Sequence, residues 1–292
     1  MRALMPETTP ETGVRSRRRG GLSPVPALVR EHDHDRFQTA LFAPVAQREA
    51  LFALYAFNYE IARIREAVRE EMLGRIRLQW WREAIEAAYS GQKPRRHETV
   101  EALTKAIACY NLSHGDFEQL LESRENDLAA SPPPTLAALE DYCDGSSARL
   151  VDLAAQILGA REAAEAVRGV GIAYGLTGLL RAMPLHAAMG RSYIPDEFAV
   201  SPADYRNHRA SSELRAATAA IADAAGRHLH AARAGRDSVP RGALAAFLPA
   251  IIASHYLVRL TRAGFDPFDP ALAAPDPLQS WRLLAASLRG RF

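Results

Sequence analysis

Apolar residues recur every three or four positions along most of the chain after residue 31. No segment alternates apolar and polar residues for the length of a strand. The three- and four-residue spacing places apolar side chains along one face of an α-helix, and alanine, the strongest helix former, is abundant. The pattern predicts an all-α protein.

Capping residues and helix breakers set the ends of the predicted helices. Thr135 and either Asp33 or Asp35 are suitable N-caps, while Ser90 followed by Gly91 is a stop signal. A short helix is expected from Pro202, after a loop over residues 187–195. The longer predicted helices span residues 33–41, 45–67, 73–89, 98–110, 114–129, 135–158, 163–183, 211–234, 241–262 and 277–288.

The 292 residues, 48% of them hydrophobic, can bury one large core. Residues 31–292 contain no repeat or composition shift and are predicted to form one domain. Residues 1–30 carry an arginine cluster at positions 15–19 but lack the apolar region of a signal peptide, and are interpreted as a flexible basic leader.

Charge and cysteine content exclude several protein classes. With 36 Lys and Arg against 34 Asp and Glu, the chain lacks the one-signed charge of a nucleic-acid binder. Cys109 and Cys143 are too few for a disulfide framework, which favours a reducing, cytoplasmic compartment. The longest apolar run, residues 243–258, falls short of the roughly 20 residues of a membrane span. At most a peripheral contact with the inner membrane is expected.

Several short stretches, taken in order, carry a family signature. Residues 50–57 read ALFALYAF, residues 78–83 read LQWWRE and residues 190–195 read GRSYIP, with Asp127-Leu128 and Tyr142-Cys143 between them. In order and spacing they resemble the squalene/phytoene synthase family over residues 33–268. The resemblance implies a single-domain isoprenoid-synthase helical bundle with a central cavity.

Active members of this family condense two prenyl diphosphates head to head, and the resemblance implies two aspartate-rich motifs on facing helices that hold Mg²⁺. The metal neutralises charge on the departing diphosphate. Aligned on residues 55–57, this chain has Ala62 and Arg63 in place of adjacent aspartates, and only Glu66 remains from the first motif.

The second motif would lie in the helix before Gly190. Its arginine corresponds to Arg181, whereas the other motif positions are Gly178, Ala182 and His186. No carboxylate occurs between residues 165 and 196. We therefore predict a pseudoenzyme that has lost both Mg²⁺-diphosphate motifs and binds no metal or other cofactor.

One branch of the family shares these features. Residues 56–58, 79–81 and 124–128 resemble the phytoene-synthase-like assembly factors of respiratory complex I, which also lack the aspartate motifs. This resemblance implies a prenyl or lipid ligand, or complex I subunits, as partners. The candidate ligand-pocket residues are Tyr55, Asn58, Trp81, Arg181, Arg191 and Tyr193.

Simpler interpretations of single residues remain open. Arg63 would then pair with Glu60, Glu66 or Glu70 on its own helix, and the aromatic residues would be core. The sequence His32 to Asp35 would serve as a helix cap rather than a metal site. The glycines at 169, 171, 175 and 178 either let helices approach closely or leave room for a chain-like ligand.

Two alternative functions remain. A diverged, active prenyl transferase would bind Mg²⁺ through other acids, which would have to converge on a cavity. A protein-interaction module would have a filled core with no cavity of roughly 300 Å³ or more. The candidate acids for the first alternative are Glu60, Glu66, Asp127, Asp141, Asp144 and Asp152.

Overall fold

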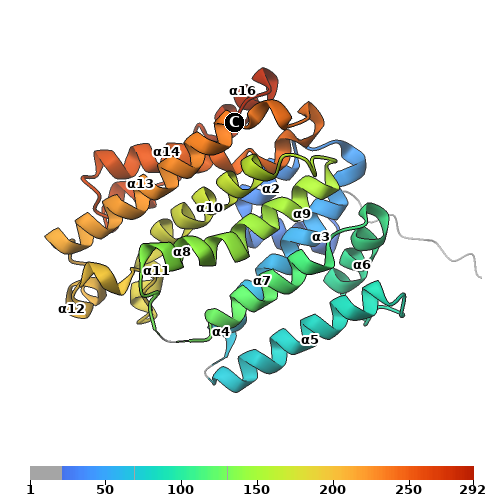
Figure 1. The fold of residues 1–292 in the computed structure, drawn as a ribbon, viewed down its shortest axis with the longest axis horizontal. Helices are drawn as coiled ribbons and strands as arrows, with labels where there is room; N and C mark the ends of the chain where they lie inside the picture. Colours follow the sequence, from blue (N-terminus) through green and yellow to red (C-terminus); the bar gives the residue numbers. More distant parts are fainter. Residues whose placement is uncertain (1–21, 69, 130) are drawn as a thin grey trace, which may run out of the picture.

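A computed structural model describes residues 22–68, 70–129 and 131–292, and every regular element in these ranges is a helix (Figure 1). The all-α prediction is confirmed. The α-helices are α1 (Pro24–His32), α2 (His34–Ala40), α3 (Val45–Ala62), α4 (Ile64–Ala67), α5 (Glu71–Tyr89), α6 (Glu98–Tyr110), α7 (His114–Asn126), α8 (Leu136–Cys143), α9 (Arg149–Ile157), α10 (Ala164–Arg181), α11 (Met183–Ala188), α12 (Pro202–Arg206), α13 (Ser212–Ala234), α14 (Pro249–Arg262), α15 (Pro270–Ala273) and α16 (Gln279–Arg289). The other helical turns are the π-helix η1 (Asp144–Ala148) and the 3₁₀ helices η2 (Asp196–Phe198), η3 (Arg236–Ser238) and η4 (Arg241–Ala246).

Local sequence explains several helix starts. The side chains of Asp33, Thr135 and Ser211 each accept a hydrogen bond from a backbone N–H in the first turn of α2, α8 and α13, respectively. These bonds satisfy amide groups that have no partner within the helix. The predicted caps at Asp33 and Thr135 are therefore confirmed.

The predicted boundary of the leader is wrong. Residues 24–30 belong to α1, whose Val25 and Val29 are buried against α3. Two prolines lie in the first turn of this helix, where proline costs no intrahelical hydrogen bond. The apolar residues at a four-residue spacing give α1 a face to bury. Residues 1–21, with the arginine cluster, lie outside the described part of the chain.

Three predicted helices are divided in the structure. Residues 45–67 form α3 and α4, residues 135–158 form α8, η1 and α9, and residues 241–262 form η4 and α14. Pro249 accounts for the last division, because it has no N–H to continue a helix and is tolerated only in a first turn. The predicted loop over residues 187–195 begins inside α11.

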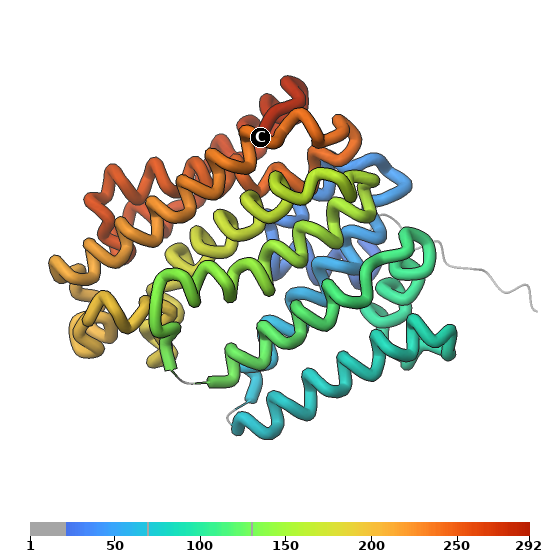
Figure 2. The backbone as a smooth tube through the Cα atoms, in the orientation of Figure 1, coloured from blue at the N-terminus to red at the C-terminus, as the bar shows by residue number. Residues whose placement is uncertain are grey.

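Helix α10 runs through the middle of the bundle, with α8, η1 and α9 on one side and α13 and α14 on the other (Figure 2). A Cβ added at Gly169 would lie 2.7 Å from the carbonyl oxygen of His228 in α13. At Gly171 it would lie 2.2 Å from the Cα of Ala148 in η1. The glycines on these two faces therefore allow close helix packing.

Helix α5 forms an edge of the bundle beside α6 and α7 (Figure 1). The buried residues of the helices join in one hydrophobic core. Within the described residues, no helix combines the length and the hydropathy needed to cross a membrane.

Candidate functional site

A cavity of about 500 Å³ lies between the α1–α2 corner, α3, α8, η1 and α10. Ala62 of α3 and Gly178, Arg181 and Ala182 of α10 line it. The structure therefore brings together the two stretches that the family resemblance aligned with the metal motifs. The volume lies within the range typical of small-molecule sites and contradicts the filled core expected of a pure interaction module.

Three motif-aligned residues do not line this cavity. Arg63 lines a separate groove on the other side of α3, and Glu66 is exposed on α4. The ring of His186 packs against Tyr193, with centroids 4.8 Å apart. The motif-aligned residues that line the cavity are therefore Ala62 of α3, Gly178 and Arg181 of α10, and Ala182 directly after α10.

An ion pair occupies one wall of the cavity. Arg181 Nη1 donates to Asp35 Oδ2 at 2.6 Å, and Asp35 also accepts hydrogen bonds from Gln279 and Tyr174. Burial alone would raise the pKa of Asp35, but the Arg181 charge and these hydrogen bonds lower it below its usual value. The charge of Arg181 is therefore engaged within the protein.

The stretch from His32 to Asp35 caps and pairs rather than forming a metal cluster. Asp33 caps α2 and accepts from Arg36 Nη1 at 2.8 Å. The guanidinium of Arg36 lies 4.9 Å from the ring centroid of Tyr174. No group of three His, Cys, Asp or Glu side chains suitable for a metal occurs among the described residues.

A buried polar network borders the same cavity. Arg124 donates to Asp127 Oδ2 at 3.1 Å, to Tyr142 Oη at 2.8 Å and to Asn58 Oδ1 at 3.2 Å. Tyr193 Oη donates to Asp127 Oδ1 at 2.8 Å. Burial alone would lower the pKa of Arg124, yet the net pKa is raised, chiefly by Tyr142 and Asp127. Burial raises the pKa of Tyr142 and of Tyr193, so both stay neutral.

This network unites segments that are distant in the sequence. Asn58 comes from α3, Arg124 from α7, Asp127 from the C-cap of α7, Tyr142 from α8, and Tyr193 from the loop after α11. All of these lie in stretches that carry the family resemblance. The hydrogen bonds of this network therefore connect α3, α7, α8 and the loop after α11 beside the cavity.

The six residues predicted for one ligand pocket do not share one. Asn58 and Arg181 line the cavity, whereas Trp81 lines the separate groove and packs on Phe57, with ring centroids 5.1 Å apart. Tyr55 is 3% exposed and lines neither space. The other two, Arg191 and Tyr193, contact Asp127. The aromatic candidates Tyr55, Trp81 and Tyr193 therefore do not line this cavity.

Sequence reasoning missed the contributions of α2, η1 and the middle of α10. Asp35, Arg36 and Tyr174 form much of the wall, and Ser147 of η1 lines it while 9% exposed. Gly178 faces open space, so here a glycine makes room. The alternation of His and Asp in residues 32–35 was the available signal for Asp35, but its partner Arg181 lies 146 positions away.

None of the acids proposed for an active enzyme lines this cavity. Glu60 bonds to Thr99 and His97, Asp144 and Asp152 lie beside Arg149, and Asp127 is held by Arg124. Glu66 and Asp141 are exposed. Each partly buried acid of this set therefore already contacts a basic or hydroxyl side chain of the protein.

His186 gives the fold a pH dependence. Burial, and then the Arg191 charge, lower its pKa from 6.5 to about 4. Because the unfolded chain takes up this proton first, stability should fall as the pH drops from about 6.5 to about 4, by up to about 1.4 kcal/mol per pH unit. Urea unfolding of the wild type and of His186→Gln at pH 7, 5.5 and 4.5 measures the difference.

The variant should lose less stability than the wild type over this interval, since glutamine cannot take up the proton. Nearby Asp127 opposes the shift and is present in both proteins. Parallel losses in the two proteins would show that His186 does not couple to the fold.

A family model for squalene/phytoene synthase matches residues 29–285. The chain belongs to the squalene/phytoene synthase family. Among curated relatives, NADH dehydrogenase (ubiquinone) complex I, assembly factor 6, of Bos taurus is 30% identical over 271 residues, covering 91% of this chain and 81% of the relative. Presqualene diphosphate synthase of Rhodopseudomonas palustris is 30% identical over 220 residues, covering 73% and 77%. The family thus includes similar proteins named for two different roles.

Solved structures agree on the isoprenoid-synthase fold. Squalene synthase HpnC from Alicyclobacillus acidocaldarius superposes with a TM-score of 0.72 and 24% identity, over 83% of this chain and 94% of that one. A dehydrosqualene synthase in complex with a ligand gives a TM-score of 0.76 at 17% identity, over 91% and 94%. The predicted fold family is confirmed.

Proposed function

We propose that this protein is a non-catalytic member of the squalene/phytoene synthase family that acts in the assembly of respiratory complex I. The similarity to complex I assembly factor 6, at 30% identity over 91% of the chain, supports the assembly role. The observation that carries the loss of catalysis is that Ala62, Gly178 and Ala182, motif-aligned residues that line the cavity, offer no side-chain oxygen to a metal.

The donor set of this cavity does not fit Mg²⁺. Magnesium prefers oxygen ligands in near-octahedral geometry, with one or two carboxylates per site. Ala62, Gly178 and Ala182 offer no side-chain oxygen. Asp33 and Asp35 also line the cavity, but both are neutralised by arginines at 2.8 and 2.6 Å. A metal would have to displace arginines from two ion pairs, which disfavours metal-assisted ionisation of a prenyl diphosphate in this cavity.

We propose that the apolar part of this otherwise largely polar cavity accommodates a prenyl or lipid chain. Leu179, Cys143 and the ring of Tyr174 supply apolar wall, and burial raises the pKa of the Cys143 thiol, which keeps it unreactive. Ser147 Oγ is buried and has no hydrogen-bond partner among residues 22–68, 70–129 and 131–292. A chain with one hydroxyl or carbonyl group could satisfy Ser147 without bringing further charge into the cavity.

An assay with prenyl diphosphates tests the loss of catalysis. Farnesyl or geranylgeranyl diphosphate with Mg²⁺ should give no squalene, presqualene diphosphate or phytoene above the background without protein, because the carboxylates needed to hold the metal are missing. An active squalene synthase assayed in parallel serves as the control. Robust product would favour the diverged transferase, for which the similarity to presqualene diphosphate synthase is the supporting observation.

A deletion strain of the source organism tests the assembly role. NADH:ubiquinone oxidoreductase activity of its membranes should fall while isoprenoid products stay unchanged, and the wild-type gene should restore the activity. Lipid extraction of the purified protein followed by mass spectrometry identifies a bound chain. Unchanged complex I activity in the deletion strain would overturn the assembly role.

A further inference from the structure

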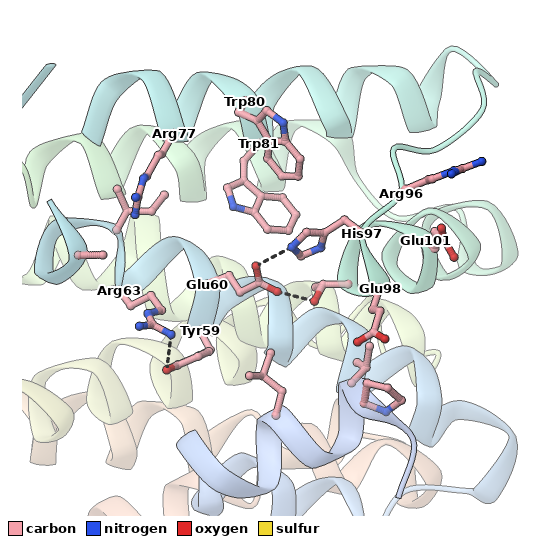
Figure 3. Close-up of a pocket in the computed structure, with 16 residues that line it drawn as sticks. Tyr59, Glu60, Arg63, Arg77, Trp80, Trp81, Arg96, His97, Glu98 and Glu101 are labelled. Atoms are coloured by element: carbon pink, nitrogen blue, oxygen red, sulfur yellow. Dashed lines mark hydrogen bonds and ion pairs between the residues drawn. The ribbon is translucent and has the colours of Figure 1, made fainter. Parts of the chain in front are cut away.

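A groove of about 980 Å³ lies between α1, the α3–α4 junction, α5 and the start of α6 (Figure 3). It shares no lining residue with the cavity described above. It is also the larger of the two spaces. Residues of two family stretches, Arg63 and the pair Trp80 and Trp81, line it, but the proposed function gives it no role.

The body of the groove is apolar and aromatic. Val25 and Leu28 of α1 line one wall, Ile64 lines the junction, and the indoles of Trp80 and Trp81 lie opposite. The two indoles meet edge to face, with ring centroids 5.1 Å apart. These surfaces can bury a hydrocarbon chain, and each methylene group transferred from water should strengthen binding by roughly fourfold.

The acid in the middle of the groove already has partners. Glu60 lies 3.3 Å from His97 Nε2 and accepts a hydrogen bond from Thr99. Figure 3 shows Glu60 and His97 at the centre of the groove, with Glu98, Glu101 and Arg96 on the side away from Arg63 and Arg77.

Two arginines occupy the opposite end. Arg63, at the end of α3, and Arg77 of α5 both line the groove there. Neither lies within 4.0 Å of a carboxylate among the described residues, so the expected pairing of Arg63 with Glu60, Glu66 or Glu70 is not found. Within the described part of the chain, the side chain of Arg63 donates one hydrogen bond, to the hydroxyl of Tyr59 at 3.0 Å. The guanidinium groups keep donors for an outside ligand.

We propose that this groove binds a single-chain anionic amphiphile, with its carboxylate or phosphate head group between Arg63 and Arg77 and its chain along Ile64 and Trp81. Guanidinium groups suit both head groups because their parallel N–H donors match paired oxygens. The two arginines are exposed at the rim, so the head-group contribution should weaken as salt is raised, whereas the chain contribution should not.

Fluorescence titration tests this proposal in a Trp281→Phe background. The chain has three tryptophans, and this change leaves Trp80 and Trp81 of the groove as the reporters. Dodecyl phosphate and dodecanoate, each below its micelle concentration, should bind and change the emission. Dodecanol should bind at least several-fold more weakly, because it has the chain without the charge.

Substitution of the arginines tests the head-group position. Arg63→Gln with Arg77→Gln should weaken dodecyl phosphate binding by about tenfold, the expected loss of charge-assisted hydrogen bonds partly screened by solvent. Arg75→Gln is the matched control, since Arg75 is an exposed arginine of the same helix that lines a different groove. Ala67→Phe, at the rim, should hinder the chain without removing charge.

The outcomes distinguish a fatty acid from a phosphate as the ligand, and binding in the groove from binding in the other cavity. Preference for dodecanoate or for dodecyl phosphate assigns the head group as a fatty acid or a phosphate. Gly178→Phe, which fills the other cavity, should leave these titrations unchanged whatever becomes of the proposed function. Equal binding of dodecanol, equally tight binding of inorganic phosphate, or an equal loss in Arg75→Gln would overturn the proposal.

Discussion

Gly171→Ala is expected to lower the free energy of unfolding by about 3 kcal/mol, the upper part of the usual range for overpacked cores. The added Cβ would lie 2.2 Å from the Cα and 2.8 Å from the backbone N of Ala148. Backbone atoms cannot rotate away as a side chain can. The π-helix η1 is also confined from its other side, because a Cβ at Gly145 would meet Ser123 Oγ at 2.3 Å.

Gly178→Ala is the matched control on the same helix. A Cβ there would meet no heavy atom within 4 Å, because Gly178 faces the cavity. Alanine should instead stabilise α10 by up to about 1 kcal/mol through its higher helix propensity. Urea unfolding followed by circular dichroism compares the two variants with the wild type. Equal stabilities for the two would contradict the close packing of α10 against η1.

Asp127→Ala is expected to destabilise the protein by about 3–5 kcal/mol, the cost of leaving one member of a buried ion pair without its partner. The side chains of Asp127 and Arg124 are 7% and 15% exposed. Removing the carboxylate leaves Arg124 as an uncompensated cation and takes away the acceptor of the Tyr193 hydroxyl. The loop after α11 should then lose the bond from Tyr193, while the bond from Arg191 to the backbone oxygen of Asp127 remains.

Glu71→Ala is the control for this prediction. Glu71 forms an ion pair of similar length with Arg75, at 2.8 Å, but on the exposed face of α5. Such surface pairs contribute little to stability. The same urea experiment measures both variants, and Arg124→Met combined with Asp127→Leu should recover part of the loss by removing both charges. A small effect of Asp127→Ala would show that the network is dispensable.

These two predictions concern the parts of the molecule that give the cavity its shape. The contact of α10 with η1 sets the position of the wall that contains Gly175 and Gly178. The network around Arg124 holds α3, α7 and α8 at the opposite wall.

Several features could be predicted from the sequence because they depend on neighbouring residues. Helix α6 has the predicted bounds, and the caps at Asp33 and Thr135 act on N–H groups three residues away. The family motifs predicted the fold and the convergence of Ala62 with Gly178 and Ala182. The helix α1 was missed because its prolines and the adjacent basic residues dominate the local composition, whereas its stability comes from burial against α3.

Periodicity and capping are short-range properties, so the sequence by itself determined an all-α chain, most of its helices and its family. Only the tertiary structure decided that Arg181 pairs with Asp35, that Arg63 faces a second groove, and that Gly171 packs a helix while Gly178 leaves space. Each of these depends on which distant helix lies opposite a side chain. That pairing is set by packing of the whole core, which no local pattern contains.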